Sequence, residues 1–122
     1  MARVFVVDDD QVVRRLAQAI LRRGGHQVVA LDNGQAALDA LEQSTPDIVI
    51  TDLMMPRMDG LELVRRIRAE ARWAALPIVV LTARGTSADL RRAREAKADR
   101  FLTKPFSSAQ LLDVVEDLTA TG

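Results

Sequence analysis

Five short apolar runs, each followed by a segment with helical spacing, constrain the fold more than any other feature of this chain. The runs cover Val4 to Val7, Val28 to Leu31, Ile48 to Ile50, Ile78 to Leu81, and Phe101 to Leu102. Each run is too short for a helix and is rich in β-branched or aromatic residues, which favours strands. Because the apolar residues are consecutive rather than alternating, we expect strands covered on both faces, as in parallel sheets.

The segments between these runs repeat apolar residues at helical spacing. In the first, apolar residues recur at i, i+3, i+4 and i+7 from Val13 to Ile20, and Gly24 follows as a stop signal. The next three helices are predicted over residues 34–43, 61–71 and 87–96. The last begins with Ser107 and Gln110, which are spaced as a capping box. Strand and helix thus alternate five times, which predicts an α/β fold with a parallel sheet and helices on both of its faces.

Length and composition indicate a single globular domain. The 122 residues suffice for one domain, which we expect to span residues 1–122. The 17 basic and 17 acidic residues balance, so the overall charge offers no general attraction for nucleic acid or for an anionic membrane. The chain has no cysteine, no signal-peptide pattern in its first residues, and no apolar run long enough for a membrane span. These features predict a cytoplasmic protein.

Polar side chains that carry chemistry follow the ends of the predicted strands. The first strand is followed by Asp8, Asp9 and Asp10, the third by Asp52, the fourth by Thr82, and the fifth by Lys104 and Pro105. A parallel sheet brings the carboxyl ends of its strands to one edge, where clustered acids raise one another's proton affinity. A hard divalent cation such as Mg²⁺ compensates such a cluster, and Lys104 would add a second positive charge. Taken alone, the three consecutive aspartates could equally be a helix N-cap.

Four motifs resemble those of the receiver domains of two-component response regulators, including single-domain chemotaxis-type regulators. They are Val6 to Asp10, Pro46 to Pro56 with Met58 to Gly60, Leu81 to Ala83, and Phe101 to Phe106. The resemblance runs over essentially the whole chain. It implies a flavodoxin-like, doubly wound, five-stranded parallel sheet in the order 2-1-3-4-5, with five helices distributed over both faces.

The resemblance also implies a role for each site residue. Asp52 would be the phosphoacceptor, in a site where Mg²⁺, or Mn²⁺ in its place, is held by Asp8, Asp9, Asp52 and the backbone carbonyl of Met54. The residues that bind the phosphoryl group or switch with it would be Thr82, Ala83, Lys104 and Phe101. The Lys104–Pro105 peptide bond is expected to be cis by analogy.

The implied function is a phosphorylation-dependent signalling switch rather than an enzyme that acts on other substrates. A histidine kinase or a histidine phosphotransfer protein would donate the phosphoryl group, docking on the first helix and on the loop after Lys104. Phosphorylation adds up to about two negative charges, and it would change the face formed by the fourth helix, the fifth strand and the fifth helix. A separate output protein, or another domain if this chain is part of a longer protein, would read that face, and the receiver itself would not contact nucleic acid or membrane.

The same face has a charge pattern that suits a dimer. The fourth helix is basic at Arg91, Arg92 and Arg94, and the fifth is acidic at Asp113, Glu116 and Asp117. A two-fold dimer could pair these charges reciprocally. Solvated charges are an equally good interpretation, because exposed ion pairs contribute little.

Several positions depart from the commonest pattern of the family or tune its chemistry. Phe101 stands where many members have tyrosine, and Lys97 stands where glycine is frequent, so a positive φ there would strain the lysine. Met54 and Arg84 flank the site and offer no acid or amide to position water, which predicts slow autodephosphorylation. The sole histidine, His26, is expected to be a surface residue rather than a phosphocarrier.

Two alternative functions stay open on the sequence alone. A haloacid-dehalogenase-type aspartyl phosphatase would use Asp8 as nucleophile and Asp10 as general acid, since the first strand also fits that pattern. A pseudo-receiver would keep the fold as a binding module without phosphorylation. The position of an acylphosphate separates the alternatives, because a receiver carries it on Asp52, a phosphatase on Asp8, and a pseudo-receiver on neither.

Overall fold

The predicted strands form one parallel sheet in the order β2-β1-β3-β4-β5. A computed structural model describes residues 1–120. The strands are β1 (Arg3–Val7), β2 (Gln27–Leu31), β3 (Ile48–Asp52), β4 (Ile78–Thr82) and β5 (Arg100–Thr103). The helices are α1 (Gln11–Arg23), α2 (Gly34–Gln43), α3 (Gly60–Arg68), α4 (Ser87–Glu95) and α5 (Ser108–Thr119), with a short 3₁₀ helix, η1 (Ala71–Trp73), after α3. The predicted flavodoxin-like topology is confirmed.

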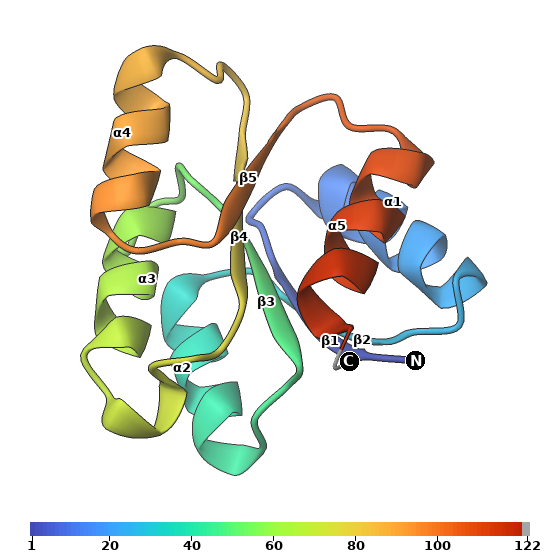
Figure 1. The fold of residues 1–122 in the computed structure, drawn as a ribbon, viewed down its shortest axis with the longest axis horizontal. Helices are drawn as coiled ribbons and strands as arrows, with labels where there is room; N and C mark the ends of the chain where they lie inside the picture. Colours follow the sequence, from blue (N-terminus) through green and yellow to red (C-terminus); the bar gives the residue numbers. More distant parts are fainter. Residues whose placement is uncertain (121–122) are drawn as a thin grey trace.

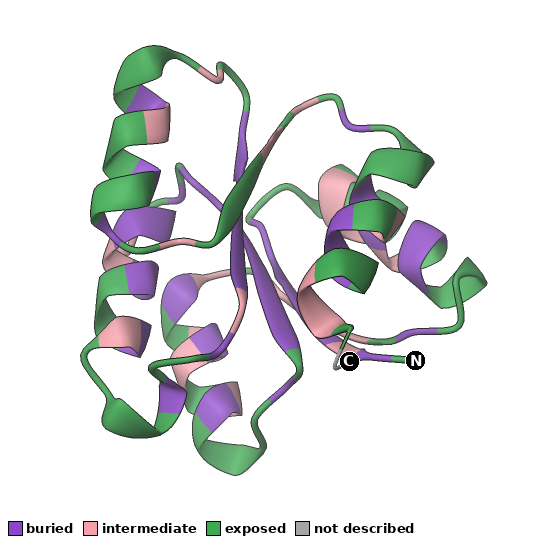
Figure 2. Ribbon diagram, in the orientation of Figure 1, coloured by how far each residue is buried: buried purple, intermediate pink, exposed green. Residues whose placement is uncertain are grey.

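The helices cover the sheet on both faces. Helices α1 and α5 lie on one face, and α2, α3 and α4 lie on the other (Figure 1). Successive strand residues point to opposite faces, so Phe5 joins the core under α2 and α3, whereas Val4 and Val6 join the core under α1 and α5. The central strands are therefore buried throughout (Figure 2), which is why their apolar residues are consecutive.

The two edge strands are less buried than the sequence pattern predicts. The residues of β2 after Gln27 are only half-buried, and three of the four residues of β5 are exposed. Each edge strand has only one neighbouring strand, and the consecutive apolar residues in these two runs did not distinguish edge from centre. The exposed side of β5 leaves Phe101 accessible, with 39% of its surface exposed.

Local signals set most helix ends. Ser107 and Gln110 form the predicted capping box at the start of α5, and the side chain of Asp10 accepts a hydrogen bond from the backbone of Val12 at the start of α1. The prediction that the third helix reaches residue 71 is wrong, because Glu70 is already extended. Arg68, at the end of α3, donates hydrogen bonds to backbone carbonyls of the segment that follows, and so holds that segment in its turn.

Among residues 1–120, two residues other than glycine have a positive φ. Lys97 has a φ of 72°, as the glycine-like position predicts, so the lysine adopts the left-handed conformation. Arg57 has a φ of 69°, which the sequence analysis did not anticipate. It lies in the loop between β3 and α3.

The expectation that His26 lies on the surface is wrong. Only 8% of its surface is exposed, because the residue lies directly before β2 and beneath the start of the chain. Its Nδ1 atom accepts a hydrogen bond from the backbone of Ala2 at 3.0 Å. The ring thus ties the first residues to the loop before β2, and its role is structural.

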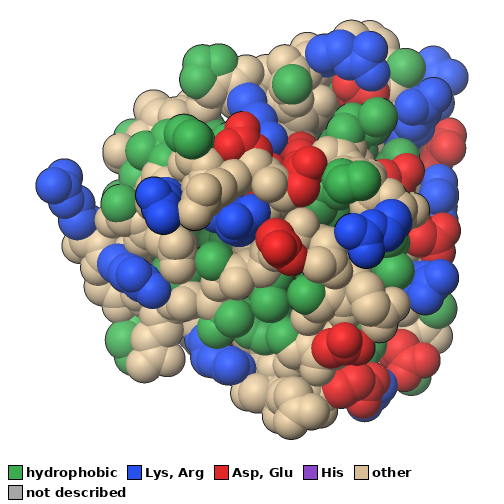
Figure 3. All heavy atoms as spheres, turned by 180° about the vertical axis from the view of Figure 1, so that it is seen from behind, with side chains coloured by type: hydrophobic (Ala, Val, Ile, Leu, Met, Phe, Trp, Pro, Cys, Tyr) green, Lys and Arg blue, Asp and Glu red, His purple; other side chains and the backbone are tan. Residues whose placement is uncertain are grey.

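The charges are spread over the surface. Acidic and basic side chains are interspersed on the face seen from behind (Figure 3), in keeping with the balance of 17 acidic and 17 basic residues. Within residues 1–120, no helix combines the length and apolar character that crossing a membrane requires.

Candidate functional site

The register of the sheet brings the acids of two strands together. In the pairing of β1 with β3, Val7 lies opposite Thr51, so the next residues, Asp8 and Asp52, meet at the carboxyl edge of the sheet. The strand order reverses at this pair of strands, which is the position where ligands bind in open parallel sheets. Both aspartates are buried, and Asp52 has 7% of its surface exposed.

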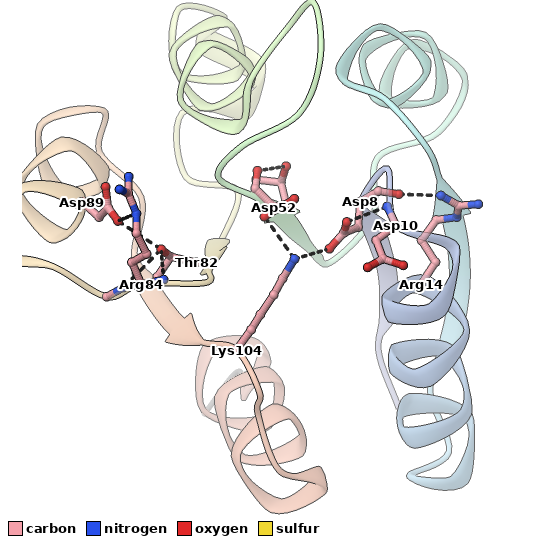
Figure 4. Close-up of polar contacts among 10 residues, drawn as sticks. Asp8, Asp10, Arg14, Asp52, Thr82, Arg84, Asp89 and Lys104 are labelled. Carbon is pink, nitrogen blue, oxygen red and sulfur yellow. Dashed lines mark hydrogen bonds and ion pairs between the residues drawn. The ribbon is translucent and has the colours of Figure 1, made fainter.

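Lys104 reaches these two carboxylates from the end of β5. Its Nζ atom lies 2.9 Å from Oδ2 of Asp8 and 3.2 Å from Oδ1 of Asp52 (Figure 4). The Lys104–Pro105 peptide bond is cis. The backbone of Lys104 donates a hydrogen bond to the carbonyl of Thr82, which fixes the start of this loop beside β4.

Burial dominates the electrostatics of Asp52. The pKa of the Asp52 carboxyl is raised to about 6, chiefly by desolvation and also by the charge of Asp8, against the opposing effects of Lys104 and of a backbone hydrogen bond at Met54. Burial lowers the pKa of the Lys104 ammonium, but its hydrogen bond to Asp8 and the charges of Asp52 and Asp8 outweigh that effect and leave the pKa raised. One ammonium therefore does not compensate the negative charge of the cluster, and the site lacks positive charge.

The carboxylates are placed to share a cation. Oxygen atoms of Asp8, Asp9 and Asp52 all lie within 4.8 Å of one another. Asp8 and Asp52 are buried and Asp9 is exposed, so the cluster opens toward solvent on the side of Asp9. Oxygen donors of this kind suit a hard divalent cation that keeps some of its waters. A cation held there would, together with Lys104, give an anionic substrate two positive partners next to a carboxylate that can act as a nucleophile.

Asp10 does not join this cluster. Its side chain is exposed and caps α1, while its backbone donates a hydrogen bond to Oδ1 of Asp8. The N-cap interpretation is thus correct for Asp10, but Asp8 and Asp9 face the other carboxylates. A phosphatase that uses Asp10 as general acid needs that side chain beside Asp8, and the helix cap holds it elsewhere.

The remaining predicted residues flank the acids. Asp52 pairs with Leu81 across β3 and β4, so Thr82 lies one residue further along the neighbouring strand. Thr82 is buried, whereas Met54, Ala83 and Arg84 are exposed around it. Phe101 lies in β5, away from the acids.

The sequence analysis missed Asp89, a buried residue of α4 with 3% of its surface exposed. Its Oδ2 atom accepts a hydrogen bond from the hydroxyl of Thr82 at 3.3 Å and lies 3.7 Å from Nε of Arg84. These three residues form a second polar group beside the acids and Lys104 (Figure 4). The only signal in the sequence was an acid three residues after Thr86, a spacing that is typical of a helix cap.

Comparison with proteins of known sequence identifies the family. Residues 4–116 match the model of the response regulator receiver domain. The chain is 41% identical to the transcriptional regulatory protein CseB of Streptomyces avermitilis over 109 residues, which are 89% of this chain and 45% of that protein. It is 36% identical to a chemotaxis protein CheY homolog of Campylobacter jejuni over 122 residues, which are 98% of this chain and 94% of that protein. The chain thus spans about half the length of the transcriptional regulator and nearly all of the chemotaxis protein.

Solved structures give the same result. A putative response regulator from Chloroflexus aurantiacus superposes with a TM-score of 0.95 at 32% identity, over 98% of both chains. The receiver domain of a sensor histidine kinase from Pseudomonas aeruginosa, described with a magnesium ion coordinated in its active site cleft, has a TM-score of 0.91 at 28% identity, over 98% of both chains. Since the family match covers residues 4–116 and the fold agrees over 98% of the chain, this chain belongs to the response regulator receiver domain family.

Proposed function

We propose that this receiver domain is a signalling switch that accepts a phosphoryl group on Asp52. The observation that supports this most directly is the position of Asp52, whose buried carboxylate lies 3.2 Å from the Lys104 ammonium and beside the carboxylates of Asp8 and Asp9. Phosphoryl transfer needs a positioned nucleophile and positive charge around the phosphoryl oxygens more than it needs elaborate covalent machinery. Asp52 and Lys104 supply the nucleophile and one of the charges.

The second positive charge beside the phosphoryl oxygens is proposed to come from Mg²⁺, with Mn²⁺ as a substitute. Asp8, Asp9, Asp52 and the backbone carbonyl of Met54 would hold it, and the excess negative charge of the three carboxylates supports this assignment. The magnesium ion in the receiver domain from Pseudomonas aeruginosa is a further argument by homology. When bound, the cation would neutralise the carboxylates and polarise a phosphoryl oxygen.

The proposed reaction joins Asp52 to phosphorus. A carboxylate oxygen of Asp52 attacks the phosphorus atom of a phosphohistidine, the new O–P bond forms as the N–P bond breaks, and the electron pair of that bond stays on the histidine nitrogen. Lys104 binds one phosphoryl oxygen, and the hydroxyl of Thr82 donates to another, next to the backbone of Ala83. Hydrolysis by water later releases inorganic phosphate and restores the carboxylate, so the domain is reset without acting on other substrates.

The phosphorylated state would alter the face formed by α4, β5 and α5. Phe101 already lies at the surface of this face, so a small rotation of its ring changes what a partner meets. The proposed phosphodonor is a histidine kinase or a histidine phosphotransfer protein, and the proposed reader is an output protein or an output domain. The relatives from Streptomyces and Campylobacter, named as a transcriptional regulatory protein and a chemotaxis protein, support an output of this kind. The proposed location is the cytoplasm, as the sequence features predict.

Two finer points belong to the same proposal. Residues 1–122 would act as one receiver unit, whose reciprocal charges on α4 and α5 favour a phosphorylation-dependent dimer. Met54 and Arg84 expose long side chains beside the site and offer no carboxylate or amide to water, which supports slow autodephosphorylation. A half-time of seconds for the purified phosphoprotein with Mg²⁺ would contradict the second point.

Intact-mass analysis after incubation with acetyl phosphate tests the function. We expect wild type to gain one phosphoryl group only when Mg²⁺ is present, and Asp52→Asn to gain none. Asp39→Asn, which changes an exposed aspartate on α2, is the matched control and should label like wild type. Labelling at Asp8 would support the phosphatase alternative, and the absence of any labelling would support a pseudo-receiver.

A further inference from the structure

Asp89 is a buried charge whose position the proposed chemistry does not yet explain. It lies in the first turn of α4, and its backbone N–H donates to the side chain of the N-cap residue Thr86. An acid at this position commonly reaches back to the backbone of the cap residue. Here the carboxylate turns toward Thr82 instead, and accepts a hydrogen bond from its hydroxyl. A buried carboxylate is costly without partners, so this contact is a substantial part of what keeps Asp89 in place.

The Thr82 hydroxyl is fully engaged with the segment that leads into α4. It donates to Asp89, and it accepts from the backbone N–H groups of Arg84 at 3.3 Å and Gly85 at 3.4 Å. A hydroxyl has only one proton to donate. If that proton is given to Asp89, it is not available to an oxygen bound at Asp52.

We propose that Asp89 is a positioning residue that holds Thr82 in its resting place and competes with the phosphoryl group for the Thr82 proton. This inference rests on the proposed function, because it assigns the competitor to phosphorylated Asp52. Moving the Thr82 proton to a phosphoryl oxygen breaks the contact with Asp89 and leaves that carboxylate with the guanidinium of Arg84, whose side chain is 65% exposed.

The same exchange carries the signal to α4. Asp89 belongs to the helix, whereas Thr82 belongs to the strand, so the contact between them ties the first turn of α4 to the end of β4. Loss of the contact releases that turn, and the output face begins to change there. Asp89 thus sets the balance between the resting and the active conformation, since it stabilises only the resting one.

Beryllofluoride, an analogue of the phosphoryl group, tests the competition by titration at a fixed Mg²⁺ concentration. A hydrogen bond to a charged acceptor is worth about a factor of ten, so Asp89→Ala should lower the half-saturating beryllofluoride concentration about tenfold. Asp89→Asn keeps the shape of the side chain and a weaker acceptor, so it should lower that concentration about threefold. The Asp89→Asn variant also tests the inference if the alanine variant does not fold. The Mg²⁺ dissociation constant should stay unchanged in both, and Asp39→Ala, at an exposed aspartate of α2, should behave like wild type.

A double-mutant cycle separates this role from a general effect on the fold. In a Thr82→Ala background, the Asp89 substitutions should no longer alter beryllofluoride binding, because the hydroxyl for which they compete is gone. An unchanged or raised half-saturating concentration in the single variants, or an equal decrease in the Thr82→Ala background, would overturn the inference. If wild type neither binds beryllofluoride nor takes a phosphoryl group from acetyl phosphate, it is the proposed function that fails.

Discussion

Replacing Asp52 by asparagine should stabilise the protein in the absence of divalent cations. Burial and the charge of Asp8 raise the pKa of Asp52 from 3.8 to about 6, a net shift that already includes the attraction of Lys104. One pKa unit corresponds to about 1.4 kcal/mol, so the ionised carboxylate costs the folded state about 3 kcal/mol above pH 6. Asparagine keeps the shape and removes this cost. The expected gain in melting temperature is on the order of 10 °C for a domain of this size.

The stability difference between Asp52→Asn and wild type should depend on pH in a defined direction. As pH rises from 3.8 to about 6, the unfolded chain loses the proton of Asp52 while the folded protein keeps it, so the contribution of this group to stability is lost over that range. The difference between variant and wild type should therefore be absent below pH 4 and largest above pH 6.

Urea denaturation from pH 4 to pH 8, with a chelator present, measures the free energy of unfolding of wild type, Asp52→Asn and the exposed control Asp113→Asn. Mg²⁺ should stabilise wild type selectively and narrow its difference from Asp52→Asn, since the cation binds the folded acids. The reasoning would be refuted if Asp52→Asn were no more stable than wild type at pH 8, or if the difference in free energy of unfolding did not change with pH. Either result would mean that burial and the charge of Asp8 do not make the ionised Asp52 carboxylate destabilising.

Three further changes test separate parts of the structure. Lys97→Gly should raise the free energy of unfolding by about 0.5–1 kcal/mol, because φ is 72° there and glycine accepts the left-handed conformation without strain; a loss of stability in urea would contradict this. Arg68→Ala should lower the free energy of unfolding by about 2–4 kcal/mol, since the largely buried guanidinium bridges Asp99 to several backbone carbonyls. An unchanged urea midpoint would show that this bridge does not stabilise the fold. Asp9→Asn should change the free energy of unfolding without cations by less than about 0.5 kcal/mol, because the residue is exposed. The same variant should lose Mg²⁺-dependent labelling by acetyl phosphate. Full labelling would show that Asp9 is not a metal ligand.

Parallel strands explain why so much of the site could be predicted from the sequence. Residues at the carboxyl ends of parallel strands reach the same edge of the sheet, whatever the conformation of the loops. The positions of Asp8, Asp52 and Thr82 in the chain therefore suffice to predict that they lie at one edge. Their roles depended on the resemblance to receiver domains, since strand-end acids alone were compatible with a helix cap or a phosphatase.

The features that were left open, missed or misjudged from the sequence depend on where a side chain points. Asp10 and Asp9 are neighbours of the same residue type, yet one caps α1 and the other faces Asp52. Asp89 was not among the predicted site residues, and its spacing from Thr86 is typical of a helix cap, whereas its carboxylate turns to Thr82. His26 follows two glycines in a polar loop, but the chain start folds over it.

The sequence by itself determined the α/β class, the five strands and which residues gather at the carboxyl edge, because hydrophobic periodicity and strand direction act along the chain. Only the tertiary structure decided that Asp52 holds its proton to about pH 6, that Lys104 bridges Asp8 and Asp52, and that Asp89 engages Thr82. Desolvation and contacts between distant residues depend on what surrounds a side chain in space, and local sequence patterns carry little of that information.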